Sequence, residues 1–302
     1  MANVLVIGSS NTDMVVRVRD IPVPGQTVMG DDMQTFAGGK GANQAVAARR
    51  AGGEVCFVAA VGGDDFGKAA VEGFINEGID THAVQVLPGV PSGVAMIFVS
   101  DQGENCIGVA PGANMKLTPD MLDSRSSVFE RSSHLLVQLE IPMKTVEAAV
   151  RMAREYDVKA ILNPAPAAAL SDQVLSGLYC ITPNETEAEA LTGISVGNLD
   201  DARSAADALL ARGVENVILT LGESGALLIN ADGEYHQAAE SVNVVDTTAA
   251  GDTFNGVLAS CLAEGLSLQE SMRLAVAGAT LSVQRQGATD SVPSRHEFDP
   301  GS

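Results

Sequence analysis

The alternation of short and long apolar segments predicts an α/β fold with a central, mainly parallel sheet flanked by helices on both faces. Strand-length runs of Val, Ile and Leu alternate with longer segments of helical spacing, which is the pattern of βαβ units. Right-handed crossovers between such units place helices on both sides of one sheet. Two stretches without helical spacing, at about 13–36 and 94–109, predict an additional small β-sheet.

The individual elements follow from their composition and their stop signals. The Ala-rich helix at 42–51 ends at Gly52 and Gly53, and the helix at 66–77 ends at Gly78. Strands are expected at 4–8, 55–61, 135–139, 158–162 and 217–221, and further helices at 143–156, 251–263 and 268–285. Since no linker, repeat or low-complexity tract divides the chain, we expect one domain over residues 1–302 with the strands of the small sheet inserted into it.

The composition is that of an acidic globular protein of 302 residues, 46% of them hydrophobic. Aromatic residues make up only 4% and Trp is absent, so we expect a core of Ala, Val, Leu and Ile and no aromatic platform for single-stranded nucleic acid. A net charge of −20 repels phosphate backbones and anionic lipids, which argues against nucleic acid and membrane partners. The N-terminal residues do not resemble a signal peptide and no segment has the length of a membrane span, so we expect a cytoplasmic location.

The cysteines and histidines show no pattern that suggests a metal site or a disulfide framework. The cysteines are far apart and lie in or beside apolar stretches, so we expect small buried hydrophobes at Cys56, Cys106, Cys180 and Cys261. The histidines lack metal-ligand or triad spacing, and we expect structural or surface roles for His82, His134, His236 and His296. A carboxylate is therefore the better candidate for a catalytic base.

A run of small residues from Asp246 to Asp252 leads directly into a predicted apolar helix. Such a turn exposes backbone N–H groups at a helix N-terminus, where they and the helix dipole attract an anion. Gly251 allows a ligand to approach closely, and Asp252 in the first helical turn is placed to accept a proton from an attacking hydroxyl. An ordinary helix cap, with Asp252 chosen for the dipole, explains the same residues equally well.

Two polar segments in the N-terminal part suit a polyhydroxylated ligand. The turn Gly38-Gly39-Lys40-Gly41 opens a helix, but it is not a Walker A loop because Gly follows the lysine and the earlier glycine is missing. Lys40 and Asn43 are possible hydrogen-bond donors to such a ligand. Asn11 and Asp13 follow the first strand, and parallel sheets bind ligands beyond the carboxyl ends of their strands. A turn or capping role is equally compatible with both residues.

Two further polar segments follow apolar stretches of the sequence. Asn184 and Glu187 are three residues apart, which on a helix places an amide and a carboxylate on one face, where they suit a hydrated Mg²⁺. A capping box explains the same spacing. The Gly-rich turn from Thr220 to Gly225 suits either the floor of a nucleotide site or a simple hairpin turn.

Taken together and in this order, these segments resemble the ribokinase-type carbohydrate and adenosine kinase family over nearly the whole chain. The segment Gly38 to Ala45 resembles the first family signature, and Asp246 to Phe254 resembles the second, which is highly specific. The segments Asn163 to Pro166 and Thr182 to Glu187 are similar to the ribokinase members in particular. The resemblance implies transfer of a phosphoryl group from ATP to the primary (O5) hydroxyl of D-ribose, giving ribose 5-phosphate and ADP.

The resemblance also implies roles for individual positions. Asp252 matches the catalytic base, and the backbone at Ala249, Ala250 and Gly251 matches an anion hole. The matching sugar-binding positions are Asn11, Asp13, Gly38, Gly39, Lys40, Asn43, Glu140 and Asp252. The matching ATP-side positions are Asn184, Thr220, Gly222, Gly225 and Gly251, with Glu187 for the Mg²⁺ that accompanies ATP. A monovalent cation, expected to be K⁺, matches Asp246, Thr248, Ser282, Arg285, Gly287 and Ser291, several of them through backbone carbonyl oxygens.

The same resemblance implies in-line phosphoryl transfer, with Asp252 accepting the proton of the attacking hydroxyl. It further implies that the small sheet is a lid and that two lids pair in a homodimer. Two alternatives stay open. A kinase of deoxyribose, another sugar or a nucleoside would keep Asp252 and the anion hole and change the sugar contacts. A non-catalytic sugar or nucleotide sensor on the same fold would be expected to lack the base or the anion hole, and this sequence has both.

Overall fold

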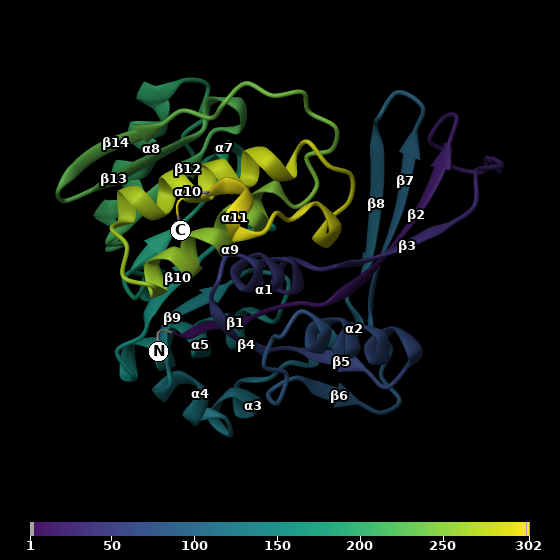
Figure 1. The fold of residues 1–302 in the computed structure, drawn as a ribbon, viewed down its shortest axis with the longest axis horizontal. Helices are drawn as coiled ribbons and strands as arrows, with labels where there is room; N and C mark the ends of the chain where they lie inside the picture. Colours follow the sequence, from purple (N-terminus) through teal and green to yellow (C-terminus); the bar gives the residue numbers. More distant parts are fainter. Residues whose placement is uncertain (1–2, 300, 302) are drawn as a thin grey trace.

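The computed structural model describes residues 3–299 and 301, and its main sheet has helices on both faces (Figure 1). Eight strands of the described chain form this sheet in the order β14-β13-β12-β11-β10-β9-β1-β4. The six strands from β12 to β4 in this order are parallel, and β13 and β14 add an antiparallel edge. The strands are β1 Asn3–Ile7, β4 Glu54–Val58, β9 Ser132–Val137, β10 Lys159–Leu162, β11 Cys180–Ile181, β12 Asn216–Thr220, β13 Ala226–Asn230 and β14 Gly233–Gln237.

Both faces of the sheet are buried because side chains alternate along each strand. In β1, Val4 and Val6 belong to one core, and Leu5 and Ile7 belong to the other. The first core is covered by α1 Lys40–Arg50, α2 Asp65–Asn76, α9 Ala250–Ala263, α10 Leu268–Ser282 and α11 Arg295–Phe298. The second core is covered by α3 Pro119–Asp123, α4 Ser126–Glu130, α5 Met143–Glu155, α6 Asp172–Leu175, α7 Glu185–Thr192 and α8 Leu199–Ala211.

A second sheet of four strands projects from the carboxyl end of β1, on the right in Figure 1. Its order is β3-β2-β7-β8, with β2 Asn11–Val18, β3 Gln34–Gly38, β7 Gly93–Ser100 and β8 Asn105–Ala110. A two-stranded sheet pairs β5 Ala60–Gly62 with β6 Gln85–Leu87. β2 starts shortly after β1, and β3 ends just before α1. The four-stranded sheet is therefore joined to the main sheet at the segment with Asn11 and Asp13 and at the turn from Gly38 to Gly41.

The predicted fold class is confirmed, including the separate small sheet. The differences are local. The strand expected at 55–61 divides at Ala59 into β4 and β5, which belong to different sheets. The β13–β14 hairpin and the two-residue strand β11 were not predicted, and the last predicted long helix ends at Ser282 rather than Arg285. Cys106 on β8 is exposed, so the prediction of four buried cysteines is wrong there, because both faces of this strand are open to solvent.

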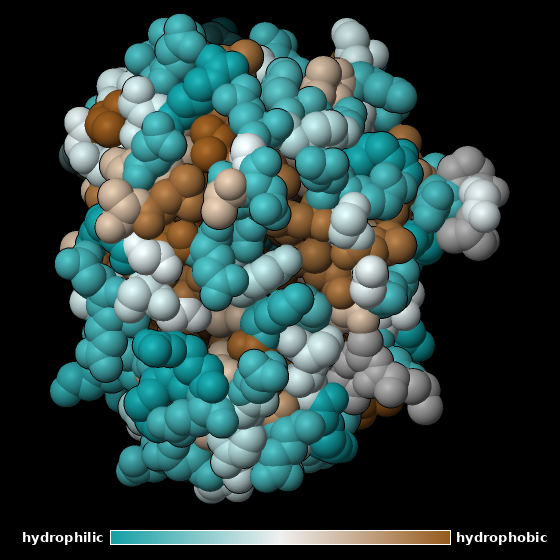
Figure 2. Space-filling view, turned by 90° about the vertical axis from the view of Figure 1, so that its left-hand side faces the viewer, coloured by the Kyte–Doolittle hydropathy of each residue, from teal (hydrophilic) through white to brown (hydrophobic). Residues whose placement is uncertain are grey.

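The surface is mainly hydrophilic on the side that carries β13 and β14 (Figure 2). Figure 2 shows the molecule from the side of β13 and β14, where hydrophilic side chains dominate and a group of apolar side chains lies near the middle of the view. No helix within residues 3–299 combines the length and the apolar character needed to span a bilayer.

Candidate active site

Asp252 is buried at the N-terminal end of α9 and is held there by two amide groups. Asn43 Nδ2 donates to Asp252 Oδ2 at 3.0 Å, and Gln44 Nε2 donates to Asp252 Oδ1 at 2.9 Å. The N-cap residue of α9 is Ala249, with φ of 58°, and no side chain makes a capping hydrogen bond to this helix. Asp252 is therefore not the cap of α9, because its carboxylate faces α1 and makes no capping bond, although it does lie in the first helical turn as the dipole explanation requires.

Close packing of α1 against α9 makes this arrangement possible. A Cβ added to Gly256 would lie 2.4 Å from Ala47 Cβ and 2.6 Å from the carbonyl oxygen of Gln44. Gly256 is one helical turn after Asp252, so its lack of a side chain lets the two helices approach. The amides at the start of α1 consequently reach the carboxylate at the start of α9.

Some groups around Asp252 raise its pKa and others lower it. Burial raises the pKa of Asp252, while the ammonium of Lys40 and the amide protons of Asn43 and Gln44 lower it, and Glu140 adds to the increase. The neighbouring backbone is open, because a Cβ added to Gly251 would meet nothing within 4 Å among the described residues. The site thus combines a desolvated carboxylate with an accessible helix N-terminus, which suits proton acceptance beside an anion.

The polar residues after β1 form a second part of the site. Burial, and then the charges of Glu140 and Asp252, raise the pKa of Asp13 to about 6. A Cβ added to Gly38 would lie 2.3 Å from Asp13 Oδ2, so only glycine leaves room for this carboxyl group. Gly39 has φ of +90°, and a Cβ there would lie 2.7 Å from the amide nitrogen of Asn11. The predicted sugar-binding glycines therefore bring β3 and α1 close to the residues that follow β1.

Glu140 joins this group from the loop after β9. Its Oε2 accepts hydrogen bonds from the Lys40 N–H at 3.0 Å and from Ser9 Oγ at 2.5 Å. Asn11 is fixed by Asn114, whose Nδ2 donates to Asn11 Oδ1 at 2.7 Å. The structure thus brings the predicted sugar-binding positions Asn11, Asp13, Gly38, Gly39, Lys40, Asn43, Glu140 and Asp252 into one region.

The predicted ATP-side residues lie at and after the carboxyl ends of β11 and β12, apart from Gly251, which lies in the first turn of α9. Asn184 and Glu187 form a complete capping box at the start of α7. The capping box that was one explanation of their three-residue spacing is therefore present. Burial raises the pKa of Glu187, and Lys40 and Asp252 both act on it electrostatically, which places it near the base. Asn184 pairs with Thr220 in an isolated parallel bridge.

The turn after Thr220 connects the antiparallel strands β12 and β13. It is therefore a hairpin turn, which was one of the two explanations for its glycines. Gly222 and Gly225 both have positive φ, of 52° and 88°. A Cβ on Gly225 would lie 2.0 Å from the carbonyl oxygen of Gln237, whereas one on Gly222 would meet nothing within 4 Å among the described residues. The turn therefore leaves its backbone accessible at Gly222.

Asp246 connects the turn before α9 to the turn after α10. Its Oδ1 accepts from the N–H and the hydroxyl of Thr248, at 2.9 and 2.6 Å, and its Oδ2 accepts from the Gly287 N–H at 3.0 Å. Burial alone would raise the pKa of Asp246, but these hydrogen bonds lower it. The other predicted cation positions lie near this connection, with Ser282 and Ser291 buried and the Arg285 guanidinium paired with Glu297.

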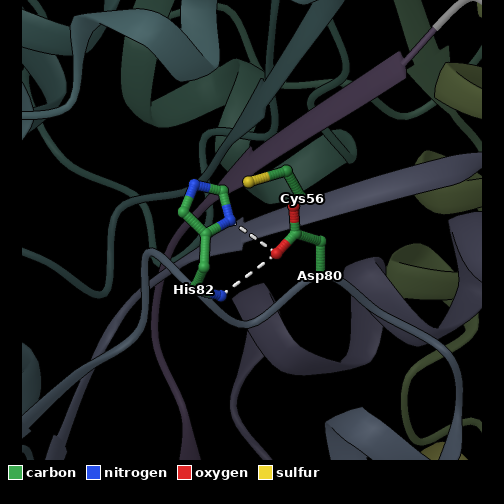
Figure 3. A group of neighbouring side chains, drawn as sticks. All are labelled: Cys56, Asp80 and His82. Carbon is green, nitrogen blue, oxygen red and sulfur yellow. Dashed lines mark hydrogen bonds and ion pairs between the residues drawn. The ribbon is translucent and has the colours of Figure 1, made fainter.

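A second group of metal-type ligands lies beside β4 (Figure 3). Cys56, Asp80 and His82 come together there, although the sequence showed no such pattern. His82 Nδ1 lies 2.5 Å from Asp80 Oδ1, and His82 Nε2 lies 3.3 Å from Arg131 Nη2. A guanidinium only donates, so Nε2 accepts and the proton lies on Nδ1, facing Asp80. Burial raises the pKa of the Cys56 thiol to about 12, and we interpret the group as a hydrogen-bonded surface cluster.

Several residues that hold the candidate site together were not predicted from the sequence to do so. They include Ser9, Gln44, Asn114, Thr182 and Asn255. Thr182 Oγ1 donates to Asn255 Oδ1 at 2.6 Å, and Asn255 Nδ2 donates to the Gly251 carbonyl at 2.8 Å, which ties the end of β11 to the start of α9. Gln44 adjoins Asn43 in the sequence and was detectable, whereas Asn114 carries no local signal.

A family model described as pfkB family carbohydrate kinase matches residues 1–295. The chain belongs to this family. This pfkB carbohydrate kinase is similar to the ribokinase of Haemophilus influenzae. The two sequences are 42% identical over 292 residues, which cover 97% of this chain and 95% of that protein. The structure of an Arabidopsis thaliana ribokinase complexed with ribose and ATP aligns with a TM-score of 0.93 at 32% identity, covering 99% of this chain and 98% of that one. The deoxyribokinase of Salmonella typhi is 36% identical over 299 residues, covering 98% of this chain and 97% of that protein.

Proposed function

We propose that this carbohydrate kinase transfers the γ-phosphoryl group of ATP to the primary O5 hydroxyl of D-ribose, giving ribose 5-phosphate and ADP. The observation that carries the proposal is the buried carboxylate of Asp252, held by two amides at the open N-terminus of α9 and close to Asp13 and Glu140. The ribokinases that match nearly the whole chain support ribose as the substrate.

Ribose binding is assigned to Asn11, Asp13, Gly38, Gly39, Lys40, Asn43 and Glu140. The carboxylates accept hydrogen bonds from sugar hydroxyls, and the Lys40 ammonium donates to sugar hydroxyl oxygens. Asn43 Oδ1 is buried and has no partner within residues 3–299, so it suits a hydroxyl donor from the sugar. These groups orient the sugar with its primary hydroxyl toward Asp252.

Asp252 accepts the proton of this hydroxyl as the oxygen attacks the γ-phosphorus atom and the bond to the bridging oxygen of ADP breaks. The backbone at Ala249, Ala250 and Gly251 stabilises charge on the transferring phosphoryl group, because N–H groups at a helix N-terminus face an anion there. ATP lies against Asn184, Thr220, Gly222, Gly225 and Gly251. This assignment places the nucleotide at the carboxyl ends of β11 and β12, beside the base.

The residues present fit two cations. Glu187 Oε2 accepts from the Asn184 N–H at 3.0 Å, and its other carboxylate oxygen is in no hydrogen bond with the described residues, which suits hydrated Mg²⁺ brought by ATP. Asp246, Thr248, Ser282, Arg285, Gly287 and Ser291 offer carboxylate, hydroxyl and carbonyl oxygens for a monovalent cation, K⁺ in this proposal. When bound, Mg²⁺ supplies positive charge that neutralises the phosphoryl oxygens.

The four-stranded sheet is proposed to act as a lid on a single kinase domain spanning residues 1–302. Met96, Ile107 and Val109 on its strands are more than half exposed, which supports pairing with the lid of a second copy. A homodimer formed through one face of the lids would cover either Met96 or the pair Ile107 and Val109, which lie on opposite faces of the sheet. A cytoplasmic location is proposed because ATP is the co-substrate.

Asp252→Asn tests the assignment of the base. The variant should fold, because asparagine is nearly isosteric, and its kcat should fall roughly 10²–10⁴-fold because it cannot accept the proton. Ribose-dependent ADP release measures kcat, and calorimetric ribose binding together with thermal melting verifies that the site and fold persist. A kcat close to the parent value would exclude Asp252 as the base.

Deoxyribose is the second candidate substrate, because the deoxyribokinase matches the chain over a similar length. ADP release with ribose, deoxyribose, other sugars and adenosine, each with and without K⁺, separates the candidates. The proposal expects the highest kcat/KM with ribose and an increase on adding K⁺. A higher kcat/KM with deoxyribose would change the substrate, and turnover with adenosine alone would reject a pentose kinase.

A further inference from the structure

A chain of buried amides ends on the carboxylate of Asp252. Gln138 Nε2 donates to Gln44 Oε1 at 2.6 Å, and Gln44 Nε2 donates to Asp252 Oδ1 at 2.9 Å and to Asn163 Oδ1 at 3.0 Å. Asn163 Nδ2 donates in turn to the carbonyl oxygen of Thr182 at 3.3 Å. Gln44 and Gln138 have no exposed surface, and Asn163 and Asp252 are each 6% exposed. These bonds are all made between protein groups, and Gln138 Oε1 is the one buried side-chain oxygen of this chain of amides without a partner among the described residues.

The direction of every amide in this chain is determined by its neighbours. A carboxylate and the side-chain oxygen of Asn163 only accept hydrogen bonds, so the NH₂ group of Gln44 has to face both. The Oε1 of Gln44 then faces Gln138, which presents its own NH₂ group. A Gln44 amide rotated by half a turn would place its oxygen against two other oxygens, at the cost of unpaired buried groups.

We propose that Gln44 is a positioning residue for phosphoryl transfer, which fixes the carboxylate of Asp252 in one orientation. This inference rests on the proposed role of Asp252 as the base. Since Asn43 donates to Oδ2 and Gln44 donates to Oδ1, each carboxylate oxygen receives one amide proton and retains a lone pair for the substrate proton. Asn43 is also assigned to the sugar, whereas fully buried Gln44 acts on the reaction only through Asp252.

The charged groups around Asp252 explain why such support matters. Three other carboxylates interact with it electrostatically, namely Asp13 on β2, Glu140 after β9 and Glu187 on α7. Lys40 at the start of α1 is the opposing cation. Burial raises the pKa of Asp252, and the amide protons of Asn43 and Gln44 oppose this increase. Loss of the Gln44 amide is therefore expected to raise the pKa of the base further.

Gln44→Met tests the proposal, because methionine has a similar length and no amide group. We expect the single-turnover rate of phosphoryl transfer at saturating ribose and MgATP to fall roughly 10- to 100-fold at pH 7. The acid limb of its pH profile should move upward by about one unit. Saturation removes any contribution from weaker ribose binding, and KM for ribose should change much less than the rate.

Gln44→Glu is the companion variant, since it keeps the shape and the hydrogen bond from Gln138 but places a second carboxyl group against Asp252. It should move the acid limb upward as well, because like charges raise the pKa of the pair. Asn216→Leu is the control for loss of a buried amide, since Asn216 is 7% exposed and bonds Tyr179 and Asn230 at the opposite end of β12. It should lower Tm without moving the acid limb.

The outcomes separate this inference from the proposed function. If Asp252→Asn is inactive while Gln44→Met keeps the parent rate and acid limb, Gln44 has no positioning role. If Asp252→Asn remains active, the proposed base itself is wrong and the inference falls with it. Side-chain amide NMR signals of Gln44 in the parent protein provide a test that needs no folded variant. They should shift as Asp252 titrates, and their independence of that titration would overturn the proposal.

Discussion

Asp13 lies where the four-stranded sheet joins the main sheet, and its carboxyl group is close to two others. Burial, and then Glu140 and Asp252, raise the pKa of Asp13 to about 6 from a usual value of 3.8. Gly38 packs against this carboxyl group so closely that any side chain there would collide with it. At the scale of single residues, the sugar side of the site is therefore built around a carboxyl group that titrates in an accessible pH range.

Ribose binding is expected to weaken as the pH falls from 7 to 5, because a protonated Asp13 accepts fewer hydrogen bonds from sugar hydroxyls. Isothermal titration calorimetry without nucleotide measures the ribose Kd across this range. Asp13→Asn should bind ribose more weakly at pH 7 and show a flatter pH dependence. An equally steep dependence in the variant would assign the titration to another group.

The same carboxyl group affects the stability of the free protein. Because its pKa is raised on folding, the folded state holds a proton between about pH 4 and pH 6 that the unfolded state has lost. The contribution of Asp13 to stability is therefore full below its unfolded pKa and decreases as the pH rises through 6. Urea unfolding should find Asp13→Asn more stable than the parent at pH 7, with the difference vanishing near pH 4. A destabilised variant at pH 7 would contradict this.

At the scale of elements, the contact between α1 and α9 brings the two halves of the site together. Gly256 is the point of closest approach, since an added Cβ would lie 2.7 Å from the amide nitrogen of Ala48 as well as close to Gln44 and Ala47. Backbone atoms cannot move aside cheaply, so α9 would have to shift relative to α1. Such a shift also displaces Asp252 from the amides of α1.

Gly256→Ala is expected to destabilise the protein by about 1–3 kcal/mol, because the extra methyl group overpacks the contact. Its kcat should fall too. Gly73→Ala is the matched control, since Gly73 also lies within a helix and an added Cβ meets nothing within 4 Å among the described residues. That variant should gain about 0.5–1 kcal/mol from helix propensity. Equal effects of the two substitutions on unfolding would exclude the packing explanation.

At the scale of the whole molecule, the four-stranded sheet projects away from the two cores and carries exposed apolar side chains (Figure 1). Met96 is 58% exposed and Ile107 is 53% exposed, and they lie on the neighbouring strands β7 and β8. Met96 pairs with Gly108 and Ile97 pairs with Ile107, so Met96 and Ile107 lie on opposite faces of the sheet. A partner that packs on either face therefore covers one of them.

The double variant Met96→Lys/Ile107→Lys should be monomeric where the parent is dimeric, because whichever face packs against the partner would then carry a lysine that has to be desolvated in the interface. Light scattering coupled to size exclusion measures the molar mass. Val86→Lys is the control, since Val86 is 50% exposed on β6, outside the four-stranded sheet. A parent that is already monomeric, or a variant that stays dimeric, would reject pairing through the lids.

The local features of both fold and site were predictable from the sequence. Short apolar runs predicted the strands of the parallel core, and glycines predicted where α1 and α2 end. The small-residue turn before Asp252 predicted an open helix N-terminus. The two-residue strand β11 and the β13–β14 hairpin were missed, since a strand this short has no measurable periodicity and the hairpin depends on pairing with β12.

The sequence by itself determined the α/β fold, the small second sheet and the family resemblance, because these depend on periodicity and motifs that are local along the chain. The residues around Asp252 by themselves left it divided between a cap and a base, and the family resemblance favoured the base. Only the tertiary structure showed that Asp252 makes no cap and accepts hydrogen bonds from Gln44 and Asn43, which are 208 and 209 residues away. A hydrogen bond acts over about 3 Å, so partners that are distant in the sequence become identifiable only when packing brings their helices together.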